Sequence, residues 1–163
     1  MKYTRFEELP VWNVSAALAL RILALGEKAK LRRRRSLRDQ IERAAISIMN
    51  NIAEGFERGT TQELLTFLYI ARGSAGEVRS MLCLMEQVPE FADFKSEISN
   101  LKSLAENASR QLRGWAAQLQ DSPIEGQRRL SEKSKRVYDN RRDRETFLVE
   151  LRNARESNLK RQA

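Results

Sequence analysis

The sequence of 163 residues contains no histidine. Histidine is the side chain that most often acts as a general base, that activates serine and cysteine nucleophiles, and that binds transition metals. Carboxylates alone can support catalysis or hold Mg²⁺, but here most acids alternate with bases on expected helix surfaces. We therefore expect a protein that is not an enzyme and that has no cofactor and no metal site.

Cysteine, glycine and proline are also scarce. The lone Cys83 can form no disulfide within the chain, and its place in the apolar run MLCLM favours a buried side chain over a reactive thiol. Seven glycines and three prolines supply few turns for an all-β fold, whereas Leu, Ala, Glu, Arg and Lys are abundant. The composition predicts an all-α protein.

Long apolar runs are absent as well. No stretch approaches the roughly 18 residues that cross a bilayer. The first residues, MKYTRFEELPVW, lack the uninterrupted apolar region of a secretory signal. We expect a soluble, cytoplasmic protein that makes no contact with membranes.

The first two helices are expected over residues 10–28 and from Ser36 to residues 56–58. Pro10 suits a first helical position, and Ser36 can act as N-cap with Asp39 as the acid of a weak capping box. Apolar residues at helical spacing define one core face on each helix. These faces comprise Val11, Ser15, Leu18, Ala19, Ile22 and Leu25, and Leu37, Ile41, Ala44, Ala45, Ile48 and Ile52.

The third helix is expected to begin with Thr60 or Thr61 as N-cap and to end before Pro89, and the fourth to cover residues 94–120. In the fourth helix the apolar residues alternate at three and four positions, as in a heptad seam. The predicted core faces are Leu64, Phe67, Leu68, Ala71, Ala75, Val78, Met81, Leu82 and Met85, and Ile98, Leu101, Ala105, Ala108, Leu112, Trp115 and Leu119.

Four helices with short links predict an antiparallel up-down four-helix bundle over residues 1–122. If the second and third helices turn at Gly59, residues whose numbers sum to about 120 lie at equal height. That register pairs Arg43 with Glu77, Ser47 with Gly73, Asn51 with Tyr69, and Glu54 with Thr66. The interruption NNIAEGFERGTTQE is then a corner, and the alternative is a ligand pocket formed by Asn50, Asn51, Glu54 and Arg58.

The run LRDQIERAAISIMNNIAEGFERGTTQELLTFLYIARGSAGEVRSML, with FEELPVW upstream, resembles a family of bacterial four-helix-bundle proteins. Intervening sequences within 23S ribosomal RNA genes encode this family. The shared motif positions are Asn51, Glu54, Gly55, Phe56, Arg58, Glu63, Phe67, Leu68, Ala71, Gly73, Ser74 and Glu77. The resemblance spans roughly residues 6–120 and implies a basic homopentamer without established enzymatic activity. Residues 123–163 look additional to a typical member.

A similar bundle is found in the accessory protein of diversity-generating retroelements. That protein resembles the same family in being a basic pentamer that binds a reverse transcriptase and nucleic acid. The resemblance therefore implies two kinds of partner, a nucleic acid and a reverse transcriptase.

Positive charge is concentrated in two places. The net charge is +3 over residues 1–122 and +5 over residues 123–163. The bases that can contact successive phosphates without reading base sequence are Lys28, Lys30, Arg32, Arg33, Arg34, Arg35 and Arg38, and in the extension Arg128, Arg129, Arg141 and Arg142. The alternative for the arginine run is a solvated connection that also complements the C-terminal end of the first helix.

Residues 123–163 carry apolar side chains too sparsely for a core of their own, and their acids and bases recur at helical spacing. This pattern predicts a basic, helical C-terminal extension. The extension can be an RNA-binding arm that folds on contact, or a docking segment for a protein.

The first and third helices carry more apolar surface than one bundle core can cover. In LLTFLYIA only Thr66 is polar, and in the first helix several apolar residues fall away from Leu18 and Ile22. These are Val14, Ala17, Leu20 and Leu25. A second apolar face suits a subunit interface. The alternative is that the C-terminal extension covers it within one chain.

Together these features predict a non-enzymatic, homopentameric bundle that binds nucleic acid, with RNA favoured, through basic surfaces. The alternative is a protein-interaction adaptor, such as an accessory subunit of a reverse transcriptase, whose basic surface meets an acidic partner.

Overall fold

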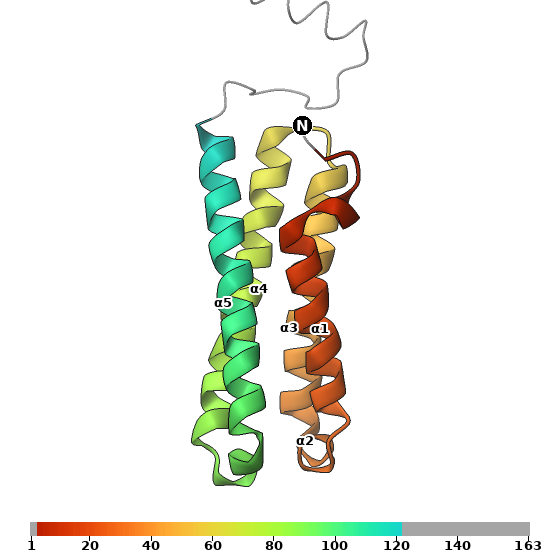
Figure 1. Cartoon of the computed structure of the whole chain (residues 1–163). Coiled ribbons are helices and arrows are strands. Elements are labelled where there is room, and N and C mark those ends of the chain that lie inside the picture. Colours follow the sequence, from red (N-terminus) through yellow and green to blue (C-terminus); the bar gives the residue numbers. More distant parts are fainter. Residues whose placement is uncertain (1–2, 122–163) are drawn as a thin grey trace, which may run out of the picture. The chain divides into compact units, whose positions relative to one another are not determined.

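The computed structural model describes residues 3–121. Four long helices lie side by side and form a bundle (Figure 1), namely α1 (Pro10–Gly26), α3 (Arg35–Glu57), α4 (Thr61–Gln87) and α5 (Lys95–Gln120). Three short elements accompany them, namely η1 (Phe6–Glu8), α2 (Ala29–Arg33) between α1 and α3, and η2 (Pro89–Phe94) between α4 and α5. The expected all-α helical bundle is confirmed.

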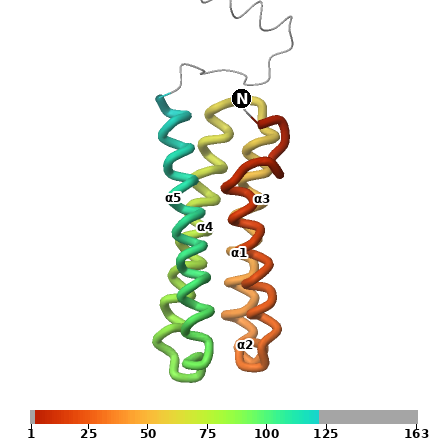
Figure 2. The backbone as a smooth tube through the Cα atoms, in the orientation of Figure 1, coloured from red at the N-terminus to blue at the C-terminus, as the bar shows by residue number. Residues whose placement is uncertain are grey.

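Each long helix packs against two neighbours. Helices α1 and α4 both contact α3 and α5, so α1 and α4 occupy opposite corners of the bundle. Between α3 and α4, Gln40 Nε2 donates to Glu77 Oε1 at 2.9 Å, and the Ser47 and Ser74 hydroxyls share a hydrogen bond of 2.9 Å. Residue numbers therefore rise along α3 as they fall along α4, and the chain reverses direction at each link (Figure 2).

The core is built from the apolar faces that the spacing predicts. Every residue of the predicted α1 face is buried, including Ser15, whose Oγ donates to the Val11 carbonyl oxygen at 2.7 Å. On the other helices most of the predicted core positions are buried. Four of them are only partly buried, namely Leu37, Phe67, Trp115 and Leu119. Among residues 3–121, no helix has both the length and the apolar character to cross a membrane.

The two predicted N-caps have different outcomes. Thr60 caps α4 as expected, because its Oγ1 accepts from the Glu63 backbone N–H at 3.2 Å. Ser36 does not cap α3, which begins at Arg35 with Arg34 in the cap position and no side-chain cap. The Arg34 backbone N–H closes the last turn of α2 on Leu31, so the chain passes from α2 into α3 without an extended residue at Ser36. Helix α1 ends at Gly26 rather than at residue 28.

The predicted ion pair between Arg43 and Glu77 is wrong. Both residues are exposed, and the Glu77 carboxylate accepts from Gln40 instead. The expected contact of Ser47 with Gly73 is also wrong, because Ser47 bonds to Ser74. Equal height along two helices does not make side chains face each other, since only residues flanking the core stripe point across the interface.

The register places Asn51 at the height of Tyr69, and Glu54 at the height of Thr66, and these four residues form hydrogen bonds with other partners. Asn51 Nδ2 donates to the Ser47 carbonyl oxygen at 2.7 Å, within α3, and the Tyr69 hydroxyl accepts from Gln120 of α5 at 2.8 Å. Glu54 bonds to Arg58 in its own helix, and Thr66 donates to the carbonyl oxygen one turn earlier. The register is close to the prediction, whereas the side-chain partners are mostly different.

Gly55 is the glycine at which α3 and α4 approach each other. A Cβ atom at Gly55 would lie 2.7 Å from Phe67 Cβ and 3.1 Å from Leu64 Cδ1. Phe67 Cβ is attached directly to the α4 backbone, so rotation of the phenyl ring cannot relieve the clash. At Gly73, by contrast, a Cβ atom would meet nothing within 4 Å. The close packing that the sequence suggested for Gly73 is therefore found at Gly55.

We expect Gly55→Ala to lower the free energy of unfolding by about 1–3 kcal/mol, because α3 and α4 must move apart. The matched variant Gly73→Ala should raise it by about 0.5–1 kcal/mol, since alanine favours the helix and has open space there. Urea denaturation followed by circular dichroism measures both. Similar effects of the two substitutions would contradict the close approach at Gly55.

Candidate nucleic-acid interface

The arginine run lies at one end of the bundle, where α2 links α1 to α3 (Figure 1). Leu31 is completely buried and anchors α2 to the core. Its neighbours Arg32 and Arg33 are exposed, so one apolar side chain holds the short helix while the charged side chains remain accessible. We call the end of the bundle formed by residues 28–38 the basic end.

Acidic side chains of η2 neutralise two residues of the basic end. Lys30 Nζ lies 2.5 Å from Asp93 Oδ2 and 5.6 Å from the centre of the Phe94 ring. Arg34 donates to Glu90 Oε2 through Nε at 3.0 Å and through Nη2 at 2.8 Å. These contacts join the link between α1 and α3 to the link between α4 and α5.

Arg38 is paired within its own helix. Its Nη2 lies 2.8 Å from Asp39 Oδ1, and its Nε lies 3.9 Å from Glu42 Oε1. The side-chain hydrogen bond with Asp39 raises the pKa of Arg38 above its ordinary value. Arg38 is therefore a base whose charge is already compensated by the bundle.

The other four bases of the run are exposed. No carboxylate lies within 4.0 Å of their charged groups among the described residues 3–121. They are Lys28, Arg32, Arg33 and Arg35. The structure thus divides the predicted phosphate contacts into a paired set and an unpaired set.

The position of the arginines at the start of α3 is unfavourable for the helix itself. The first turn of α3 contains no acid, and Arg34 occupies the cap position without making a side-chain cap. Because the N-terminus of a helix carries partial positive charge, each cation there costs about 0.3–1 kcal/mol at low ionic strength. A role in complementing the C-terminal end of α1 suits Lys28, but it does not explain Arg34 and Arg35.

A groove of about 690 Å³ lies beside the basic end. Three arginines line it, namely Arg33, Arg34 and Arg35. Its apolar lining consists of Leu37 of α3, Met81 and Leu84 of α4, Val88 at the start of η2, and Phe91 within η2. Sequence reasoning missed this groove because most of its apolar residues, on α4 and near η2, are distant in sequence from the arginines. Leu84 falls outside the predicted core face of α4, and the structure leaves it exposed.

The motif residues at the turn between α3 and α4 form an ordered corner. Arg58 Nη2 lies 2.6 Å from Glu54 Oε1, and Arg58 Nη1 lies 3.8 Å from Glu63 Oε1. The Arg58 guanidinium also lies over the Phe67 ring, 5.2 Å from its centre. Asn50 is exposed on α3. These contacts favour the interpretation of the motif as a corner over that of a ligand pocket.

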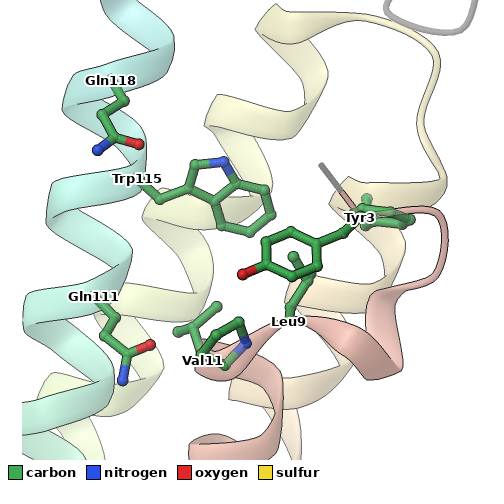
Figure 3. Close-up of a pocket in the computed structure, with 8 residues that line it drawn as sticks. Tyr3, Leu9, Val11, Gln111, Trp115 and Gln118 are labelled. Atoms are coloured by element: carbon green, nitrogen blue, oxygen red, sulfur yellow. The ribbon is translucent and has the colours of Figure 1, made fainter. Parts of the chain in front are cut away.

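A second pocket, of about 280 Å³, lies where α1 begins and α5 approaches its end (Figure 3). Tyr3 and Trp115 extend toward each other, above Leu9 and Val11, and Gln111 and Gln118 project from α5 beside them. Of the residues that the structure describes, none of those lining this pocket is charged. It is therefore a poor candidate for binding phosphate, and sequence reasoning did not predict it.

The remaining predicted nucleic-acid contacts, Arg128, Arg129, Arg141 and Arg142, lie outside the described residues 3–121. The same is true of the extension over residues 123–163 as a whole.

The fold and the basic end define this protein as a four-helix bundle with a concentration of exposed arginines at one tip. A family model described as 23S rRNA-intervening sequence protein matches residues 7–114. The chain belongs to this family, as the sequence motifs predict. A comparison with curated proteins finds no match.

We expect Leu31→Ala to lower the free energy of unfolding by about 2–4 kcal/mol, because it removes the apolar anchor of α2. The control Arg32→Ala, on the same short helix but exposed, should change it by no more than about 0.5 kcal/mol. Chemical denaturation of both variants measures the difference. If both variants lost an equally small amount of unfolding free energy, Leu31 would not be the residue that holds the basic end in place.

Proposed function

We propose that this protein binds nucleic acid through the basic end of its bundle. The observation that carries the proposal is a set of exposed bases, Lys28, Arg32, Arg33 and Arg35, next to the positive end of α3. Within residues 3–121 these bases have no carboxylate partner. Helix ends of this kind attract anions, and arginine forms paired hydrogen bonds with phosphate oxygens. The bundle supplies a site for the phosphate backbone.

Contacts of this kind position a nucleic acid without reading its sequence, because the phosphates are the same in every sequence. We favour RNA as the partner, since the family is named for intervening sequences of 23S ribosomal RNA. Neither catalysis nor a cofactor belongs to this proposal. The protein acts by binding.

We further propose that the bundle assembles into a homopentamer. Leu20 of α1 is 68% exposed, and Tyr69 and Ile70 of α4 are 44% and 46% exposed. Leu25, which the sequence suggested for the same outer face, is buried in the core instead. Because α1 and α4 lie at opposite corners, their outer faces point away from each other.

Two different apolar faces on opposite sides of a subunit favour head-to-tail contacts, and such contacts form a ring when the rotation between successive subunits closes. The number five comes from the resemblance to the family. A ring repeats the basic end once per subunit, so that weak phosphate contacts on one strand reinforce one another through effective concentration.

The combined substitution Arg32→Ser, Arg33→Ser and Arg35→Ser should weaken binding to all RNA sequences alike. The slope of log affinity against log salt should decrease by about 0.7 for each phosphate contact that is lost on a single strand. Fluorescence anisotropy with a labelled RNA, repeated at several salt concentrations, measures both quantities.

The control for this experiment removes the same charge elsewhere, by substituting serine for exposed arginines of α4 and α5. These are Arg72, Arg79 and Arg110. If the control weakens binding as much as the variant of the basic end, the interaction follows net charge rather than this site. Unchanged affinity and slope in the variant of the basic end would contradict the proposal and favour an adaptor function.

The assembly proposal predicts that Leu20→Glu and Ile70→Glu each disrupt the ring, because each places a charge in an apolar contact. A head-to-tail interface makes a further prediction for a mixture of the two variants. Each retains one intact face, so the mixture should form a heterodimer that cannot grow. Light scattering measures the masses, and a monomeric unmodified chain would contradict the assembly.

A further inference from the structure

The groove beside the basic end has a composition that phosphate binding does not require. Its lining includes Arg33, Arg34 and Arg35 and also aliphatic side chains such as Leu84 and Val88. Leu84 is 54% exposed. Contact with the phosphates of a nucleic acid would leave this aliphatic surface in water.

We propose that this groove binds an acidic, amphipathic peptide segment of a partner protein. The apolar side chains of the segment would pack on Leu84 and Val88, and its carboxylates would bond to Arg33 and Arg35. Grooves between helices commonly bind amphipathic segments in this way, through apolar anchors one or two turns apart. The inference goes beyond nucleic-acid binding, because it assigns a protein partner to the apolar lining of the groove, although Arg33 and Arg35 belong to both surfaces.

The charge of the groove supports an acidic partner. Three arginines line it, and Glu90 compensates only Arg34, which donates two hydrogen bonds to one carboxylate oxygen. That pair shows that a carboxylate can be held at the edge of the groove. Arg33 and Arg35 have no carboxylate within 4.0 Å among residues 3–121. They are the donors that a partner's Asp or Glu side chains would use.

The apolar lining of the groove favours a peptide over a nucleic acid. Proteins that bind single strands stack the bases on accessible aromatic rings. The aromatic residue of this groove, Phe91, is 1% exposed and therefore offers no ring face. Aliphatic side chains instead match leucine, isoleucine or valine side chains of a peptide, whose burial is favourable by about 25 cal/mol per Å².

The groove is also separate from the apolar surface that we assign to assembly. Leu84 follows Ile70 by four turns of α4, which is about 21 Å along the helix axis. A subunit packed around Tyr69 and Ile70 can therefore leave the groove open. If a second copy occupied the groove, Leu84→Gln would change the mass of the assembly.

A labelled synthetic peptide of about 14 residues, with leucine at positions i, i+3, i+4 and i+7 and glutamate on both flanks, provides the probe. We expect it to bind the full chain with an affinity that falls as salt is added, because salt screens exposed charges. The same peptide with lysine in place of glutamate should not bind. Fluorescence anisotropy measures both titrations.

Substitutions in the chain then locate the binding site. Leu84→Gln and, independently, Val88→Ser should each weaken peptide binding by about tenfold. Ile46→Gln, which removes an exposed isoleucine from α3 outside the groove, should leave it unchanged. Circular dichroism and thermal unfolding confirm that each variant is folded, and two different substitutions ensure that one unstable variant does not decide the result.

A substitution that strengthens binding provides a sharper test. Glu90→Gln removes the carboxylate that occupies Arg34, so the peptide should bind about twofold to threefold more tightly. The control Asp93→Asn releases Lys30, which does not line the groove, and should have no such effect. Loss of peptide binding in Glu90→Gln would contradict the proposed role of Arg34.

Three outcomes would overturn the inference. The first is that the acidic peptide fails to bind. The second is that Leu84→Gln weakens RNA binding as much as peptide binding, which would place the nucleic acid in the groove. The third is that Leu84→Gln changes the mass of the assembly, which would place a second copy there. RNA binding that persists without peptide binding overturns only this inference, whereas peptide binding without RNA binding overturns only the proposed function.

Discussion

The close approach of α3 and α4 at Gly55 is the constraint on which the rest of the structure depends. The absence of a side chain at Gly55 lets Phe67 and Leu64 pack directly against α3, and Thr60 then caps α4 immediately after the turn. This corner sets the register of the hairpin over its whole length. It thereby places the start of α3 beside the end of α4, where the arginines and the apolar side chains form one groove.

The basic end shows a conflict between local and global requirements. Arginines at the start of α3 oppose the helix dipole, and no side chain caps this end. The contacts of Glu90 with Arg34 and of Asp93 with Lys30 offset part of the repulsion, although exposed ion pairs stabilise by no more than about 1 kcal/mol. Natural sequences keep such conflicts mainly at functional sites. We therefore interpret the unpaired arginines as residues that serve an external anion rather than the fold.

Apolar spacing was sufficient to predict the helices and their buried faces, because burial of one stripe per helix dominates the folding energy. It was insufficient for side-chain partners such as Arg43 and Glu77, which depend on the direction of each side chain as well as on its height. The cap at Ser36 failed for a related reason, since the unexpected helix α2 carries the chain directly into α3. The groove could not be predicted, because residues as distant in sequence as Arg33 and Leu84 meet only after the hairpin has formed.

The exposed apolar faces and the basic end differ in their place along the helices, and this separation would allow them to act together. The exposed apolar residues Leu20 and Ile70 lie on the sides of the bundle, whereas Arg32 and Arg35 lie at its tip. In the proposed assembly, subunits that pack side by side would therefore bury the apolar faces without covering the arginines. Assembly would also bring like charges closer, and an anionic strand lying across several tips would relieve this repulsion. Binding of nucleic acid and assembly would then stabilise each other, because each lowers the free-energy cost of the other.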